Sequence, residues 1–219
     1  MTGTFPFLCS LGFAASATVT VAAHALGRRS LVYVFKPLST ALLALLVVAG
    51  PSRLPSPYAM AVLGGLLFSL LGDVFLMLPS DHFRSGLFAF LLAHVCYVIA
   101  FTADSPFASP KLPFVLWLAV GCSVLPALWP GIPWRLRPPV IVYMALLLAM
   151  AAQATSRAVS LHTAHAFHVS LGAALFVLSD SLLAWNRFRK PFPAAQAFIH
   201  ATYFPAQWLI AISTLVLKT

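Results

Sequence analysis

Two aspartates lie inside long apolar stretches of the chain, where a charged side chain is costly. Asp73 belongs to the segment SLLGDVFLML and Asp180 to the segment FVLSDSLLAW. An ionised aspartate at the centre of a membrane helix costs about 2.5–3.5 kcal/mol on insertion scales, so such residues normally face a polar interior. Two carboxylates in one dry cavity do not both ionise easily, so one can donate a proton while the other accepts one. General acid–base chemistry with water requires that division.

The two aspartates occupy matching places in two similar segments. GLLFSLLGDVFL, which begins at Gly65, resembles GAALFVLSDSLL, which begins at Gly172. In both, glycine precedes aspartate by eight residues and leucine follows it by three. Downstream, FLLAH at 90–94 resembles YFPAQ at 203–207. The sequence therefore predicts two parallel four-helix repeats, which would bring both carboxylates to one depth near a shared axis.

Further polar side chains accompany the aspartates inside the apolar stretches or at their ends. They are His94, Gln207, Tyr97, Tyr203, Tyr143, Lys36 and Asn186. Lipid cannot satisfy such groups, so we expect them to face the interior of the bundle. His94 and Gln207 match each other in the two repeats, and a tyrosine lies one helical turn from each.

Each of these residues also has an ordinary structural explanation. A single intramembrane aspartate can simply bond a neighbouring helix, and such bonds average less than about 1 kcal/mol. His94 can be a satisfied core histidine, and Lys36 can extend its stem to the interface. Tyr143 and Tyr203 can be packing residues with a bonded hydroxyl. The presence of a second, matching aspartate favours a catalytic role for Asp73 and Asp180.

Composition places the chain in a membrane. Of its 219 residues, 61% are hydrophobic and 8% are charged, whereas a soluble domain has roughly a quarter of its residues charged. The net charge of +9 comes from cations scattered through short loops, which is typical of topology signals and not of a nucleic-acid surface. The sequence predicts an all-α, polytopic membrane bundle surrounded by membrane lipids, with no nucleic-acid partner.

Eight apolar stretches are long enough to span a membrane, which takes about 20 residues. They cover approximately residues 5–25, 31–49, 58–78, 84–103, 112–129, 138–155, 164–186 and 195–217. Short polar or proline-rich breaks separate them, among them SRAVSLH at 156–162. None of the breaks can hold a soluble domain, so we expect residues 1–219 to form one integral membrane domain with repeat halves at about 1–107 and 108–219.

Basic residues concentrate in every second loop. These loops carry Arg28, Arg29, Arg84, Arg135, Arg137, Arg187, Arg189 and Lys190. The other side has Arg53, Lys111, Arg157 and Lys218. Positive residues stay on the cytoplasmic side, so we expect both termini to be non-cytoplasmic, in a membrane of the bacterial inner (cytoplasmic) type.

Motifs of several enzyme classes are missing from the sequence. It contains no HExxH, GxSxG or Walker motif, so zincin, serine-hydrolase and ATPase functions have no support. His162, His165 and His168 are spaced by three, but no carboxylate or cysteine is near them in the sequence. We therefore expect neither a metal site nor an organic cofactor.

The ordered motifs resemble those of a known family. They are Lys36-Pro37-Leu38, Gly72-Asp73, Ala93-His94-x-x-Tyr97, Ser179-Asp180-x-x-Leu183-Ala184-Trp185 and Tyr203-x-x-Ala206-Gln207-x-Leu209-Ile210. From the second predicted helix to the last, the sequence resembles the YhhN-type lysoplasmalogenase family. The resemblance implies eight membrane helices and a hydrolase that cleaves the vinyl-ether bond of choline or ethanolamine lysoplasmalogens. The implied products are a fatty aldehyde and a glycerophospho-alcohol.

That chemistry agrees with the paired carboxylates. A vinyl ether hydrolyses when its β-carbon is protonated and water traps the resulting cation, which two carboxyl groups can promote without a cofactor. Asp73 and Asp180 are the expected catalytic pair, in an order that the sequence leaves open. The expected residues for positioning water or substrate are His94, Gln207, Tyr97, Tyr203 and Tyr143. The expected head-group residues are Lys36 and Asn186.

Two other functions fit parts of the same pattern. Internal repeats and intramembrane acids are also typical of transporters, so a small-solute or proton-coupled transporter or channel is the main alternative. Pro126 and Pro205 leave room for the broken helices that such proteins use. A lipid-binding or scaffolding membrane protein is the third interpretation. Turnover of a lysophospholipid substrate separates the hydrolase from both, and the oligomeric state is left open.

Overall fold

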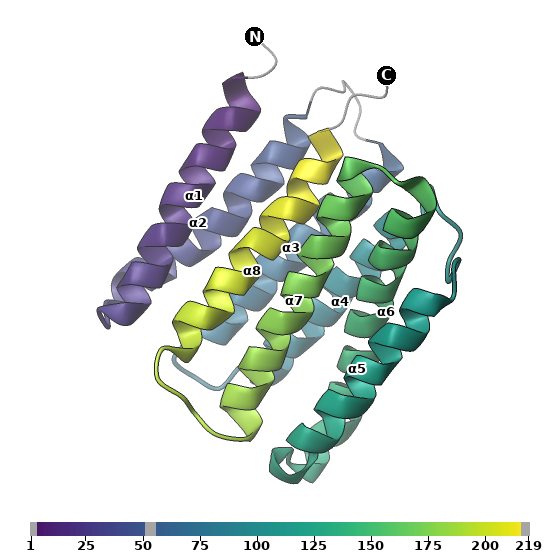
Figure 1. The fold of residues 1–219 in the computed structure, drawn as a ribbon. Helices are drawn as coiled ribbons and strands as arrows, with labels where there is room; N and C mark the ends of the chain where they lie inside the picture. The colour runs from purple at the N-terminus through teal and green to yellow at the C-terminus, as the bar shows by residue number, and fades with distance from the viewer. Residues whose placement is uncertain (1–3, 51–55, 216–219) are drawn as a thin grey trace.

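The chain folds into a bundle of antiparallel helices (Figure 1). The computed structural model describes residues 4–50 and 56–215. Within these residues the chain forms eight α-helices: α1 (Thr4–Ala25), α2 (Arg29–Val48), α3 (Pro57–Met77), α4 (Phe83–Phe101), α5 (Leu112–Leu128), α6 (Arg137–Leu161), α7 (Ala164–Phe188) and α8 (Ala195–Ile212). Three short 3₁₀ turns in the same residues are η1 (Trp129–Gly131), η2 (Trp134–Leu136) and η3 (Ser213–Leu215). The prediction of an all-α bundle is confirmed.

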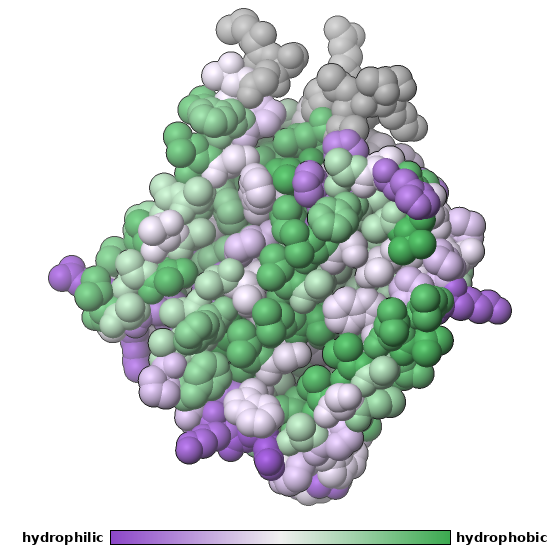
Figure 2. Space-filling view, in the orientation of Figure 1, coloured by the Kyte–Doolittle hydropathy of each residue, from purple (hydrophilic) through white to green (hydrophobic). Residues whose placement is uncertain are grey.

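Seven helices in the described part of the chain, α1 to α7, are long and apolar enough to cross a membrane. Figure 2 shows hydrophobic side chains over the middle of the visible face and hydrophilic ones gathered towards its ends. Helix α8 lies in the bundle against α7, α1 and α2, but its 18 residues include Gln196, His200 and Gln207. The polytopic architecture is confirmed, and α8 is the one α-helix of the described residues that is not among these candidate spans. Its predicted end, 216–217, lies outside the described residues.

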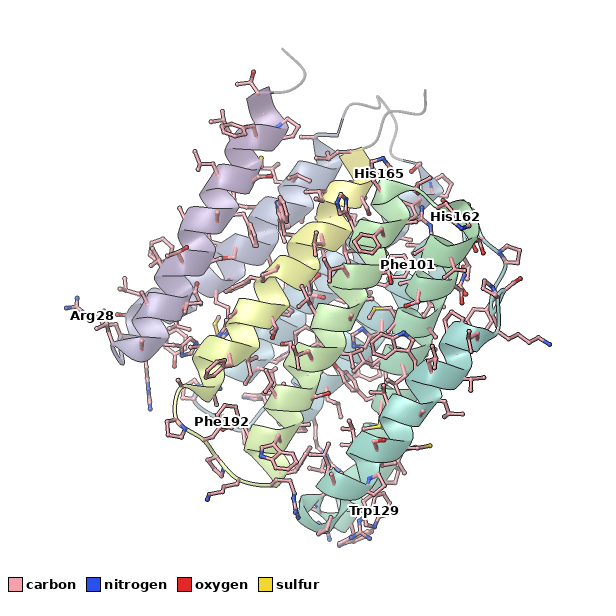
Figure 3. The ribbon with its side chains drawn as sticks, in the orientation of Figure 1. Arg28, Phe101, Trp129, His162, His165 and Phe192 are labelled. Carbon is pink, nitrogen blue, oxygen red and sulfur yellow. The ribbon has the colours of Figure 1, made fainter. Side chains whose placement is uncertain are left out.

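The connections that follow α1, α3, α5 and α7 all lie at one end of the bundle (Figure 1). We call it the Arg-rich end, because it carries Arg28, Arg29, Arg84, Arg135, Arg137, Arg187, Arg189 and Lys190. In Figure 3, Arg28, Trp129 and Phe192 mark this end, and His162 and His165 mark the opposite one. Two cations predicted for the opposite end, Arg53 and Lys218, lie outside the described residues.

Tryptophan rings flank the cations at the Arg-rich end. The Arg137 guanidinium lies 4.6 Å from the centroid of the Trp129 ring, and that of Arg135 lies 5.2 Å from the Trp134 ring. Both rings are exposed. This is how aromatic side chains at a membrane–water interface normally lie, with cation–π contacts as a further stabilising interaction.

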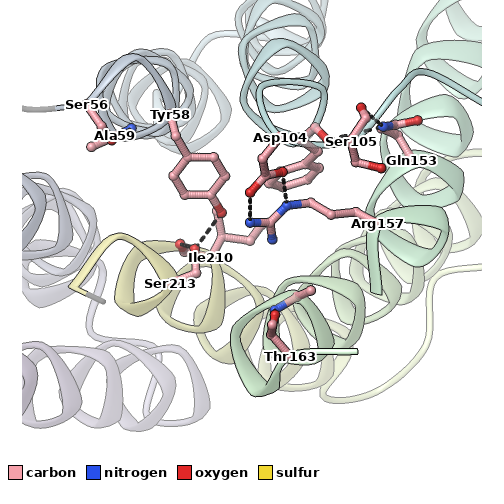
Figure 4. A network of polar contacts seen from close by, with 12 residues as sticks. Ser56, Tyr58, Ala59, Asp104, Ser105, Gln153, Arg157, Thr163, Ile210 and Ser213 are labelled. Carbon is pink, nitrogen blue, oxygen red and sulfur yellow. Dashed lines mark hydrogen bonds and ion pairs between the residues drawn. The ribbon is translucent and has the colours of Figure 1, made fainter. Parts of the chain in front are cut away.

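Helix α6 is longer than predicted, because residues expected to form a break are paired inside the bundle. The prediction that 156–162 breaks the helix is wrong, since α6 continues to Leu161. Arg157 is buried and donates two hydrogen bonds to Asp104, at 2.7 and 2.6 Å. Its guanidinium also lies 5.0 Å from the Tyr58 ring centroid, and both side chains are drawn in Figure 4. A paired arginine can stay helical at a depth where an unpaired one is costly.

The connection between α4 and α5 is held by hydrogen bonds to Gln153, a buried side chain of α6. The amide nitrogen of Gln153 donates to the carbonyls of Phe101 and Ser105, at 3.1 and 3.2 Å. Its amide oxygen accepts from the Ala108 N–H at 3.0 Å. Together with the pair between Asp104 and Arg157, this network fills the end of the bundle opposite the Arg-rich end (Figure 4).

Two matching glycines let consecutive helices approach closely. A Cβ on Gly65 of α3 would lie 2.2 Å from the Tyr97 ring of α4. A Cβ on Gly172 of α7 would lie 3.2 Å from Ile210 of α8. These are the two glycines that precede the aspartates by eight residues. Close packing at these points fixes how α3 and α7, which carry the aspartates, sit against the helices that follow them.

Candidate active site

Asp73 lies near the end of α3 in a closed polar network. Its side chain is only 2% exposed, and the Lys36 ammonium of α2 lies 3.2 Å from Oδ1. The Thr40 hydroxyl donates to Oδ2 at 2.9 Å, and the Tyr203 hydroxyl of α8 donates to the same oxygen at 2.7 Å. One cation and two donors therefore compensate the charge of a buried carboxylate, which would otherwise be strongly unfavourable.

A chain of hydrogen bonds between side chains of α4 and α8 leads to this network. The Tyr97 hydroxyl of α4 donates to the side-chain oxygen of Gln207 at 2.6 Å. The Gln207 amide donates in turn to the Tyr203 hydroxyl at 3.2 Å. These side chains bond one another and lead to Asp73, so their geometry suits orienting that carboxylate.

Asp180 lies on α7 beside a second polar pair. The Tyr143 hydroxyl of α6 donates to Oδ2 at 2.5 Å. His94 Nε2 of α4 lies 3.1 Å from that hydroxyl and 3.7 Å from Oδ2. Among the described residues, the buried Nδ1 of His94 has no hydrogen-bond partner. The arrangement permits an Nε2–H to donate to Tyr143, which donates to Asp180.

Aromatic rings fill the space between the two networks. The Phe176 ring of α7 lies 5.5 Å from the Tyr203 ring and 5.0 Å from the His94 ring, both in edge contact. Phe90 of α4 packs against Phe176 and Tyr203 at 6.2 and 5.9 Å. Edge-to-face packing at these distances is favourable and stiff, so the two networks are held in fixed relation.

Both aspartates line one cleft at the Arg-rich end. The cleft encloses about 1130 Å³, including its open mouth, and is lined by residues of α2, α3, α4, α7 and α8. Three of the other predicted site residues line it: Lys36, Tyr203 and Asn186. Three are fully buried in the core: His94, Tyr97 and Gln207. The structure thus brings Asp73 and Asp180 to a shared space, as the sequence predicted, and puts Tyr143 in a neighbouring cavity.

Sequence reasoning missed two residues of the site. Thr40 follows Lys36 by one helical turn on the same face of α2, a spacing that points to it once Lys36 is chosen. His200 lines the cleft, donates from Nδ1 to the Gln196 carbonyl at 2.6 Å, and stacks on the His24 ring at 4.7 Å. His24 belongs to α1, far away in the sequence, and no spacing predicts that contact.

A second ion pair lies at the mouth of the cleft. Arg187 donates to Asp81 at 2.5 Å, and both side chains are exposed. This hydrogen bond holds the pKa of Asp81 below its ordinary value. Because the pair is exposed, its contribution to stability is small.

The two carboxylates are bonded in corresponding ways. Asp73 of α3 receives its partners from α2 and α8. Asp180 of α7 receives its partners from α6 and α4. In the predicted repeat, α2 corresponds to α6 and α8 corresponds to α4. Each aspartate therefore has partners on one helix of its own half and on the matching helix of the other half, which is the pattern that a repeat would produce.

The described residues contain no group of three histidine, cysteine, aspartate or glutamate side chains arranged to hold a metal ion. His165 and His168 are neighbours, with ring centroids 6.4 Å apart. They lie at the start of α7, and Figure 3 shows His165 at the end of the bundle opposite the Arg-rich end. The candidate site is thus built from carboxyl, hydroxyl, amide, imidazole and ammonium groups.

Fold and site together define a polytopic helical membrane protein whose two intramembrane aspartates share a cleft. The chain belongs to the YhhN family, whose model matches residues 31–214. It is 33% identical over 183 residues to a membrane protein named YhhN from Escherichia coli O6:H1, covering 83% of this chain and 86% of the relative.

Two human relatives carry names that state an activity. Lysoplasmalogenase TMEM86B is 36% identical over 179 residues, covering 79% of this chain and 73% of the relative. Lysoplasmalogenase TMEM86A is 33% identical over 167 residues, covering 73% of this chain and 67% of the relative. None of the solved structures matches the chain.

Proposed function

We propose that the chain is a membrane lysoplasmalogenase, which hydrolyses the vinyl-ether bond of a lysophospholipid. The observation that carries the proposal is that two intramembrane aspartates line one polar cleft in a protein of the YhhN family. The names of the two human relatives supply the substrate class. A buried carboxyl pair beside water-accessible space suits acid–base hydrolysis.

The reaction needs a proton donor and a proton acceptor. A carboxylic acid protonates the β-carbon of the vinyl ether, which leaves an oxocarbenium ion. Water adds to the carbon that carries the ether oxygen and loses a proton to a carboxylate. The hemiacetal then collapses, its hydroxyl proton passes to the leaving oxygen, and the products are an aldehyde and a glycerophospho-alcohol. Electrostatic stabilisation of the oxocarbenium ion is the largest contribution that the site can make to the rate.

The surroundings favour Asp180 as the acid and Asp73 as the base. The carboxylate of Asp73 is already compensated by Lys36, Thr40 and Tyr203, so it is suited to remain charged, to face the cation and to accept the proton of water. Asp180 has no lysine or arginine within salt-bridge distance among the described residues and lines both the cleft and the apolar cavity beside it, so we assign it the role of proton donor.

The remaining predicted residues support one aspartate or the other. Tyr97 and Gln207 orient Tyr203 and through it Asp73, whereas His94 and Tyr143 serve as a relay to Asp180. For the head group we propose Asn186, with Lys36 close to the phosphate.

Orientation follows from the charge distribution. With its excess of arginine, the Arg-rich end is proposed to face the cytoplasm, which leaves both termini outside it. The membrane is proposed to be a bacterial inner membrane. A lysolipid of the cytoplasmic leaflet then presents its head group to the mouth of the cleft and its vinyl-ether bond to the aspartates.

The test is a substrate panel analysed by mass spectrometry. Purified protein in nanodiscs is incubated with vinyl-ether, alkyl-ether and acyl lysophosphatidylethanolamine of equal chain length. We expect loss of the vinyl-ether species alone, with aldehyde and glycerophosphoethanolamine in equal amounts. The double variant Asp104→Asn, Arg157→Met serves as a control, because this pair lies at the opposite end of the bundle and its joint removal leaves no buried cation unpaired. Loss of the acyl species instead would contradict the proposal, and so would solute flux through liposomes with every lysolipid intact.

A further inference from the structure

A second cavity adjoins the cleft and differs from it in character. It comprises about 730 Å³ between α4, α5, α6 and α7, including its open side, and its walls are almost entirely apolar. The polar atoms on its walls come from Tyr143, Asp180 and Ser181. Five residues line both spaces: Leu76, Phe83, Phe90, Asp180 and Leu183. Asp180 therefore stands where a polar space meets an apolar one.

The apolar cavity extends along the helices. On α6 its walls run from Val140 to Leu148, and on α5 from Leu128 to Val120. Eight residues of helix span about 12 Å. The cavity is narrow, which suits an aliphatic chain more than a bulky ring system.

Helix α5 is positioned to let a lipid enter from the side. It is the least buried of the seven candidate spans, at 17% against 28–50% for the others. It packs mainly against α6, with a smaller contact to α7, and it lies at the edge of the bundle in Figure 1. The wall formed by α5 is thus the most easily displaced side of the cavity.

We propose that this cavity holds the single hydrocarbon chain of the lysolipid, with the vinyl-ether bond beside Asp180 and the head group in the cleft. The assignment rests on the proposed function and adds to it the position of the chain. It also predicts a preference for one-chain lipids, because a second chain would have to lie in the polar cleft. The groove between α1 and α8 is also apolar, but neither aspartate lines it.

Filling the cavity should change the chain-length preference. Val124 of α5 lines the cavity, whereas Val115 of the same helix is 60% exposed and does not. For Val124→Phe we expect kcat/KM on long-chain vinyl-ether lysolipids to fall about tenfold or more relative to short-chain ones. The matched control Val115→Phe should keep the wild-type ratio. Equal ratios in both variants and wild type would contradict the chain site while leaving the hydrolase function intact.

A photo-crosslinking experiment locates the chain without turnover. The probe is a saturated alkyl-ether lysophosphatidylethanolamine with a diazirine in mid-chain, added to the wild-type protein in nanodiscs. We expect labelled peptides from 120–148 and 177–188, with labelling suppressed by excess vinyl-ether lysolipid. Labelling confined to 10–25 and 201–208, which form the groove between α1 and α8, would overturn the assignment. Failure of the wild type to consume vinyl-ether lysolipids would refute the function itself and is measured separately.

Discussion

Asp73 and Asp180 occupy matching sequence positions but differ in their surroundings. The side chain of Asp73 is 2% exposed and forms an ion pair with Lys36. The side chain of Asp180 is 12% exposed, has Tyr143 and His94 as partners, and faces both the polar cleft and the apolar cavity. Asp73 is thus a buried carboxyl group with its own cation, whereas Asp180 lies at the boundary between the cleft and the apolar cavity.

The difference suggests a division of labour. A buried carboxylate that has its own cation and two hydroxyl donors is a compensated part of the core. Asp180 lies between the polar cleft and the apolar cavity. An amphipathic substrate that occupies both spaces must place the junction of its polar and apolar parts beside this carboxyl group. In a lysoplasmalogen, that junction is the vinyl ether.

Removing the carboxyl group of Asp180 should have the largest effect on activity. Asp180→Asn keeps the shape of the side chain but cannot donate a proton as a carboxylic acid does. We expect aldehyde release to fall by about 10²–10⁴-fold, the range of general acid catalysis, while the thermal unfolding temperature stays close to wild type. Aldehyde assays and melting curves on the same preparation check both. An active Asp180→Asn would remove Asp180 from the mechanism.

Breaking the compensated pair should affect stability as well as activity. Asp73→Asn leaves Lys36 as a buried cation without its partner, which costs about 3–5 kcal/mol. Combining it with Lys36→Met should restore much of the stability, because neither charge is then left alone, but should not restore turnover. If Asp73→Asn is as stable as Asp180→Asn, the contrast between the two sites fails.

The tyrosines offer a milder comparison between the two networks. Tyr143→Phe and Tyr203→Phe each remove one hydroxyl that donates to an aspartate. A hydrogen bond to a charged group contributes about 1.5–3 kcal/mol, so we expect a reduction in rate of about tenfold or more from either variant. Each variant also leaves one further donor unpaired, that of His94 or that of Gln207. Tyr203→Phe should lower the melting temperature more than Tyr143→Phe, because it removes a donor from the more deeply buried carboxylate, that of Asp73. The reverse order of stability would contradict the idea that Asp73 is the structural member of the pair.

The smallest effect is expected at the mouth of the cleft. Because Arg187 lowers the pKa of Asp81 in the folded chain, the pair adds its stability above the unfolded pKa and loses it as the pH falls through the folded pKa. From about pH 5 to 8 the carboxylate is charged in both states. Asp81→Asn should therefore give a pH–rate profile parallel to wild type over that range. A new inflection there would assign Asp81 a role in catalysis.

Much of this architecture can be predicted from the sequence, because the helices are apolar and their ends are marked by proline, glycine and arginine. The meeting of Asp73 and Asp180 at one cleft can be predicted too, since matching segments imply matching places. The extension of α6 to Leu161 cannot, because it depends on Arg157 finding Asp104 across the bundle. A hydropathy profile predicts that the apolar segment ends at Arg157. The free-energy cost of burying this arginine is offset only by its partner Asp104, which the profile does not contain.

Partners of the aspartates were harder to predict for a similar reason. Lys36 resembles any lysine near a helix end, whose stem can reach the interface. Its burial against Asp73 depends on the packing of α2 against α3. The contact of His24 with His200 joins α1 to α8, and no local pattern connects two helices so far apart in the chain.

The most direct test of the central claim is to run the reaction in D₂O and analyse the aldehyde by mass spectrometry after trapping. If a solvent-exchangeable acid protonates the β-carbon before water attacks, the aldehyde formed by the wild type carries a single deuterium on the carbon next to the carbonyl. Asp180→Asn forms this product slowly or not at all. An aldehyde without deuterium, or rapid labelled turnover by Asp180→Asn, would contradict hydrolysis through the carboxyl group at the junction of the two cavities.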